Sequence, residues 1–131
     1  MIDFKQVLIL DDNETTIFLH QDLIEDVFPN AEVYTYTDSD TFLEDLIKNN
    51  TWFESPTLLL LDINMPDKQG YDVLEEMEEE IEDTEELSVL MVTSSNLKRD
   101  LERSKRFSNI VGYIEKPLTQ VKVRQSLGEF Y

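Results

Sequence analysis

Four consecutive leucines, Leu58 to Leu61, run directly into Asp62. Such a run is too short to span a membrane, and a helix is rarely apolar on every side, so it predicts a strand buried on both faces. Pro66 cannot continue a strand ladder, and Gly70 allows backbone angles that other residues resist, so a loop should follow Asp62. Ligands of open parallel α/β sheets bind at the carboxyl ends of the strands. Asp62 is therefore predicted to lie where chemistry takes place.

The composition narrows the class of protein. A chain of 131 residues fits one domain, expected to span residues 1–131, that can bury a core without covalent staples. It has no cysteine and a single histidine, His20, which argues against disulfides, thiolate metal sites and zinc. The first five residues do not resemble a signal peptide, and no apolar run approaches the roughly 18 residues of a membrane span, so a cytoplasmic protein is expected.

The net charge of the chain restricts the kinds of molecule that it is expected to bind. A net charge of -18 repels phosphate backbones and anionic lipids, so we expect neither nucleic-acid nor membrane binding, and divalent cations or basic proteins are better partners. Nine of the twelve residues in 75–86 are acidic, which predicts a solvated helix face and a mobile loop, with a docking surface as the alternative. The next predicted helix is basic and would give an output face for an acidic partner, through Lys98, Arg99, Arg103, Lys105 and Arg106.

Strand and helix patterns alternate along the whole chain. Apolar, β-branched runs predict strands at 4–10, 33–36, 58–61, 88–93 and 110–114. Helical spacing and capping residues predict helices at 14–27, 38–49, 71–81, 96–107 and 119–127. Five strand and helix pairs with short links predict an α/β fold, a doubly wound parallel sheet covered by helices on both faces.

Polar residues end four of these strands. Asp11 and Asp12 follow the first strand, Asp62 the third, Thr93 the fourth and Lys116 the fifth. Because parallel strands share one carboxyl edge, these side chains should converge there. Three converging carboxylates would raise one another's proton affinity unless a cation is bound, so the pattern predicts a metal site, with Mg²⁺ as the hard, oxygen-seeking candidate.

These residues together resemble the receiver domain of two-component response regulators, over essentially the whole chain. The matching features are the acid pair before Asn13, Asp62 with Met65-Pro66 and Gly70 behind it, Thr93 after an apolar strand, and Lys116-Pro117 after Tyr113. The resemblance implies a flavodoxin-like (βα)5 fold with strand order 2-1-3-4-5. It also implies a signalling module that assists only its own phosphorylation and dephosphorylation and is not otherwise an enzyme.

Roles in the family carry over residue by residue. By resemblance, Asp62 is the phosphoacceptor for a histidine kinase or histidine phosphotransfer protein, and Lys116 pairs with the phosphoryl oxygens. The metal ligands implied are Asp12 directly, Asp11 through water, Asp62 itself and the main-chain carbonyl of Asn64.

The resemblance further implies a switch. Thr93 moves toward the phosphoryl group and Tyr113 turns inward, which changes the surface of the fourth helix, fifth strand and fifth helix for an unknown downstream protein. The Lys116-Pro117 peptide is expected to be cis. Asn64 and Ser95 occupy positions that tune the phosphoryl lifetime in the family, and the chain is expected to be a monomer or a weak dimer.

Other interpretations remain for single residues and for the whole chain. Asp11 and Asp12 could simply cap a helix, Tyr113 could be core, and His20 is expected on the surface. The chain as a whole could be a constitutive interaction module with a receiver fold. A hydrolase of the haloacid dehalogenase type is disfavoured because Asn64 stands where that family has a second aspartate, and Pro66 disfavours a calcium loop.

Overall fold

The computed structural model describes residues 3–94 and 101–128. Its strands form one parallel sheet in the order β2-β1-β3-β4-β5, a flavodoxin-like arrangement that confirms the predicted fold. The strands are β1 (Gln6–Leu10), β2 (Glu32–Tyr36), β3 (Thr57–Asp62), β4 (Leu87–Thr93) and β5 (Ile110–Glu115). The helices are α1 (Glu14–Val27), α2 (Ser39–Lys48), the short 3-10 helix η1 (Asn50–Glu54), α3 (Gly70–Glu80), α4 (Leu101–Ser104) and α5 (Gln120–Ser126).

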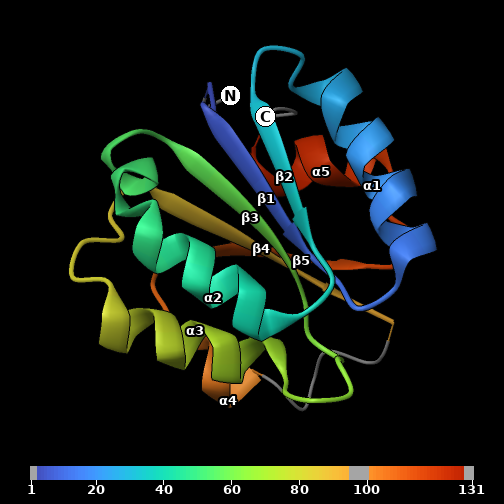
Figure 1. Cartoon of the computed structure of the whole chain (residues 1–131). Coiled ribbons are helices and arrows are strands. Elements are labelled where there is room, and N and C mark those ends of the chain that lie inside the picture. Colours follow the sequence, from blue (N-terminus) through green and yellow to red (C-terminus); the bar gives the residue numbers. More distant parts are fainter. Residues whose placement is uncertain (1–2, 95–100, 129–131) are drawn as a thin grey trace.

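The sheet separates two hydrophobic cores. Helices α1 and α5 cover one face of the sheet, and α2, α3 and α4 cover the other (Figure 1). Successive strand residues point to opposite faces, so Leu58 and Leu60 enter the core beneath α1 and α5, whereas Leu59 and Leu61 enter the opposite core. Every residue of β3 is buried, which confirms that the leucine run is a strand covered on both sides.

Capping residues begin several helices at the predicted positions. The side chain of Asn13 accepts a hydrogen bond from the Thr16 amide at the start of α1, and Asp38 and Thr119 do the same for α2 and α5. The first part of the predicted helix 96–107 lies outside the described residues, together with Ser95, Lys98 and Arg99. Within the described ranges, no helix has both the length and the apolar character needed to cross a membrane.

The predicted surface position of His20 is wrong. His20 is only 7% exposed and lies on the buried side of α1 with Ile17, Ile24 and Val27. Those positions follow the three- and four-residue spacing of one helix face, so the helical period itself places the imidazole inside. Burial lowers the pKa of His20, with a raising influence from Asp11 and a lowering one from Lys116, so the ring is neutral at pH 7.

Candidate functional site

Three acidic side chains meet at the carboxyl end of the sheet. Asp11 and Asp12 follow β1, and Asp62 is the last residue of the adjacent strand β3. Each of these carboxylates has an oxygen within 4.8 Å of the other two. Asp11 and Asp62 are buried, while Asp12 is exposed. The structure therefore brings together the carboxylates that the sequence predicts at this edge.

Lys116 reaches the same cluster from the end of β5. Its Nζ lies 3.0 Å from Oδ2 of Asp11 and 3.7 Å from Oδ2 of Asp62. The shorter contact is a hydrogen bond donated to a carboxylate that is almost fully buried. One ammonium group among three carboxylates leaves an excess of negative charge, so the site favours a further cation.

Burial and the neighbouring charges both act on the Asp62 carboxyl group. Burial, the repulsion of Asp11 and a smaller repulsion of Asp12 together raise the pKa of Asp62 to about 6. Lys116 and the Asn64 amide act in the opposite direction without cancelling the rise. At pH 7 the carboxylate is mostly ionised, so it is available as an oxygen nucleophile or as a metal ligand.

A hydrogen-bond path joins Asp62 to Thr93 at the end of β4. The amide of Asn64 donates to Oδ1 of Asp62 at 3.2 Å, and the Nδ2 group of Asn64 donates to Oγ1 of Thr93 at 3.0 Å. Thr93 is completely buried, and its carbonyl accepts the Lys116 amide at 2.8 Å. The side-chain contact between Asn64 and Thr93 is one that no sequence pattern indicated.

Gly70 is required for a different reason from the one its sequence position suggested. The φ angle of Gly70 is not positive; among the described residues, the glycine with a positive φ is Gly128. Instead, a Cβ atom at position 70 would lie 2.9 Å from the Asp62 carbonyl oxygen. The start of α3 therefore packs directly against the backbone of Asp62.

The capping interpretation of the acid pair is wrong. Asn13, rather than Asp11 or Asp12, caps α1, and the Asn13 amide donates to Oδ1 of Asp11 at 3.0 Å. The second oxygen of Asp11 is held by Lys116. Asp11 is thus a buried member of the polar cluster, and Asp12 extends from it toward solvent.

Tyr113 lies between core and surface on β5. Its ring is half-buried and packs against the core beneath α2 and α3, and its hydroxyl group lies 3.0 Å from that of Tyr71. The neighbouring Lys116-Pro117 peptide is cis, as predicted. Tyr113 is therefore neither a plain core residue nor a free surface side chain.

An apolar hollow of about 690 Å³ opens beside Lys116, between α1 and the start of α5. Its lining includes Leu19, His20, Leu23, Pro117 and Leu118. On the same helix, Phe18 is 72% exposed and Leu19 is 61% exposed. Large apolar side chains in contact with water next to a polar site are typical of an interaction surface.

The donor set fits a hard divalent cation. The converging ligand atoms are carboxylate oxygens, which Mg²⁺ prefers, and one of the three carboxylates remains open to solvent. Burial contributes most to the raised pKa of Asp62, and the negative charge of Asp11 adds to it, so a cation bound here would favour the ionised carboxylate.

Comparison with known protein families matches residues 7–128 to the response regulator receiver domain.

This chain belongs to the response regulator receiver family. Receiver domains are signalling modules rather than classical enzymes, and they interact with histidine kinases or phosphotransfer proteins. The receiver assignment agrees with two curated relatives, the polar-differentiation response regulators DivK of Brucella ovis and Brucella anthropi. They are 32% and 31% identical to this chain over 117 residues, which cover 88% of this chain and 86% of each relative.

Solved structures show the same fold at lower identity. A two-component response regulator from Cytophaga hutchinsonii superposes with a TM-score of 0.83 at 21% identity, covering 98% of this receiver and 97% of that chain. A CheY-like receiver domain protein from Methanospirillum hungatei JF-1 gives 0.72 at 24% identity, covering 96% and 92%. The architecture is thus shared across receivers whose sequences have diverged widely.

Proposed function

We propose that this chain is a phospho-receiver in which Asp62 accepts a phosphoryl group from the phosphohistidine of a histidine kinase or histidine phosphotransfer protein. The observation that carries the proposal is the cluster of Asp11, Asp12 and Asp62 beside Lys116. A carboxylate oxygen of Asp62 attacks phosphorus while the bond between phosphorus and the donor imidazole nitrogen breaks. The imidazole leaves with the electron pair, and Asp62 becomes an acyl phosphate.

The cation in this proposal is Mg²⁺. Asp12 would bind it directly and Asp11 through water, with Asp62 and the main-chain carbonyl of Asn64 as further ligands. When bound, Mg²⁺ supplies positive charge to the equatorial oxygens of a loose phosphoryl transition state. Both oxygens of Asp11 already accept hydrogen bonds, from the Asn13 amide and from Lys116, which supports an indirect role for Asp11.

Lys116 and Thr93 complete the catalytic group. Catalysis of phosphoryl transfer is mostly positioning and charge stabilisation, and the Lys116 ammonium already lies 3.7 Å from a carboxylate oxygen of Asp62. Transfer to Asp62 would draw this ammonium from Asp11 to the phosphoryl oxygens. The Thr93 hydroxyl, now in contact with Asn64, would donate to the new group.

The proposed switch follows from these movements. Departure of Thr93 from its present contact makes room for Tyr113 to turn inward, which alters the surface of α4, β5 and α5. This surface would bind a downstream protein or pass the phosphoryl group on. We infer that residues 1–131 act as one cytoplasmic receiver domain, a monomer or weak dimer, without nucleic-acid or membrane binding.

The exposed apolar residues of α1 support donor docking beside Asp62. Phe18 and Leu19 offer apolar area to a helix of the donor, and the neighbouring hollow leads to Lys116. A donor seated here would bring its phosphohistidine to the carboxyl edge of the sheet.

Incubation with Mg²⁺ and acetyl phosphate tests the proposal. Intact-mass spectrometry should show the addition of one phosphoryl group, which Asp62→Asn abolishes. Asp67→Asn is the matched control, because it removes an exposed carboxylate from the same loop and should leave uptake intact. Absence of uptake from acetyl phosphate and from a panel of phosphorylated kinases would instead favour a constitutive interaction module.

A further inference from the structure

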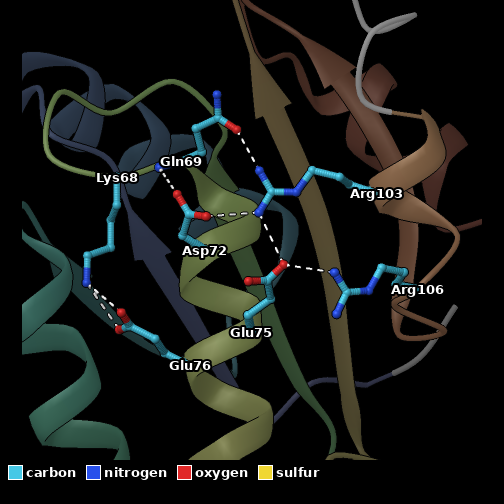
Figure 2. Close-up of polar contacts among 7 residues, drawn as sticks. All are labelled: Lys68, Gln69, Asp72, Glu75, Glu76, Arg103 and Arg106. Carbon is cyan, nitrogen blue, oxygen red and sulfur yellow. Dashed lines mark hydrogen bonds and ion pairs between the residues drawn. The ribbon is translucent and has the colours of Figure 1, made fainter.

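Arg103 of α4 reaches across to the segment that enters α3 (Figure 2). Its Nη1 group donates to Oε1 of Gln69 at 2.8 Å, and its Nη2 group donates to Oδ1 of Asp72 at 2.9 Å. The Nη2 group also reaches Oε1 of Glu75 at 3.3 Å. The guanidinium carbon lies 5.0 Å from the centre of the Tyr71 ring. One side chain thus joins α4 to three polar groups and an aromatic face.

Two of these partners also hold the N-terminus of α3. Gln69 is the N-cap residue, and its backbone N–H donates to Oδ2 of Asp72 at 2.9 Å. Arg103 binds the other oxygen of that carboxylate and the side-chain amide of the cap itself. The hydrogen bond from Arg103 leads the influences that hold the pKa of Asp72 below its usual value, so this carboxylate stays ionised.

The same segment is connected to Asp62. Gln69 and Asn64 pair as an antiparallel bridge, and the Gly70 amide donates to the Ile63 carbonyl at 3.0 Å. Asn64 in turn contacts both Asp62 and Thr93. The loop 63–69 is therefore closed at its far end by the residue that Arg103 holds.

Arg106 provides an internal comparison. It follows α4 and donates to Oε1 of Glu75 at 3.1 Å (Figure 2). Its guanidinium carbon lies 5.8 Å from the Phe107 ring centre. The contact with Glu75 secures the same region of the chain to α3 about one turn further from the loop. Ordinary surface ion pairs are each worth about 0–1 kcal/mol, so if the two arginines made only such pairs, neither substitution would alter the loop at Gln69.

We propose that Arg103 is a positioning residue for the phosphorylation site, because it fixes the Gln69 end of the loop that carries Asn64. The arrangement of α4 and the geometry around Asp62 then constrain each other. An acidic partner that draws Arg103 away would loosen the loop and weaken cation binding. This inference rests on the proposed function for its consequence, but its structural part is measurable without phosphorylation.

Hydrogen exchange of the metal-free protein tests the structural part. Arg103→Gln should accelerate exchange of the Gln69 and Gly70 amides by roughly three- to tenfold, the effect of losing a net hydrogen-bond contribution on local opening. Arg106→Gln should leave both amides within about twofold of the wild type, since it spares the loop contacts. Arg103→Lys should give an intermediate rate, because an ammonium cannot reproduce the guanidinium fork.

Titration with Mg²⁺ alone tests the functional part. Arg103→Gln should weaken Mg²⁺ affinity at least about threefold while Arg106→Gln does not, as coupling through the loop requires. Equal effects of the two variants, or faster loop exchange with unchanged Mg²⁺ affinity, would overturn the proposal. A wild-type protein that binds Mg²⁺ as described but takes up no phosphoryl group would instead overturn only the proposed function.

Discussion

The hydroxyl groups of Tyr71 and Tyr113 lie 3.0 Å apart and form a hydrogen bond between α3 and β5. Tyr71 is completely buried and stacks on Phe107, whereas Tyr113 is half-buried. Tyr113, the proposed switch residue, is thus hydrogen-bonded to α3, the helix that follows the loop after Asp62. Any inward turn of Tyr113 has to break this bond or move Tyr71 with it.

Removal of either hydroxyl group should show this coupling. Tyr71→Phe and Tyr113→Phe are each expected to lower the free energy of unfolding by about 0.5–1.5 kcal/mol, the net contribution of one hydrogen bond. Urea unfolding of both variants and of the double variant measures the interaction. The double variant should lose clearly less than the sum, and additivity within about 0.3 kcal/mol would mean that the two groups do not stabilise each other.

The raised pKa of Asp62 predicts a pH-dependent stability. Folding raises the pKa of Asp62 from 3.8 to about 6 in the absence of metal. The folded state then binds this proton more tightly than the unfolded state, so this group's contribution to stability falls as pH rises from 4 to 6 and is level above 6. Asp62→Asn removes this titration. The free energy of unfolding of this variant, relative to that of the wild type, should therefore increase by about 1–3 kcal/mol between pH 4 and pH 7.

Urea unfolding at several pH values in EDTA measures that difference. Asp26→Asn, at an exposed position of α1, controls for the loss of one negative charge. A constant difference between Asp62→Asn and the wild type across the range would contradict a raised pKa at Asp62.

Divalent metal should stabilise the folded protein. At a free Mg²⁺ concentration ten times the dissociation constant the gain is about 1.4 kcal/mol, or a few degrees in Tm. Thermal unfolding with Mg²⁺ and then with excess EDTA should show the shift and its reversal. Asp12→Asn should lose most of it and Asp67→Asn should retain it, so an equal response of these two variants would place the metal elsewhere.

The close packing of Gly70 against Asp62 predicts that a methyl group added at position 70 destabilises the folded protein. Gly70→Ala would put its Cβ 2.9 Å from a main-chain oxygen, and a crowded backbone relaxes poorly, so a loss of about 1–3 kcal/mol is expected. Gly112→Ala is the comparison, because its nearest contacts are side-chain atoms of Leu90 and Ser126 at 3.2 Å. Chemical denaturation should rank Gly70→Ala as the more destabilised variant, and the reverse order would refute the packing argument.

The sequence predicts the parts of this structure that depend on the spacing of apolar residues and on the residues that end strands or begin helices. Buried strands such as Leu58 to Leu61 need an apolar run and little else, and parallel pairing then carries Asp62 and Lys116 to one edge. Helix starts follow because Asn13, Asp38 and Thr119 each satisfy local amides within three residues. The apolar runs and the caps are short-range signals that a single sequence carries, whereas the strand order is implied by the family resemblance.

Contacts between side chains of different helices could not be predicted in this way. The sequence predicts a solvated acidic helix face and a basic output face, whereas in the structure Arg103 and Arg106 pair with Asp72 and Glu75 of α3. The expected basic output face is thus partly neutralised within the molecule. Long flexible side chains have no sequence period that reveals their partners, and the link from Asn64 to Thr93 escaped prediction for the same reason.

Asp72 and Glu75, in the first half of α3, are paired with arginines, and the C-terminal end of this helix differs. Glu78, Glu79 and Glu80 occupy the last turn, all exposed, and no basic residue accompanies them. Three negative charges there oppose the helix macrodipole, whose C-terminus is already negative. The C-terminal turn of α3 should therefore unfold first at low ionic strength, and added salt should stabilise it.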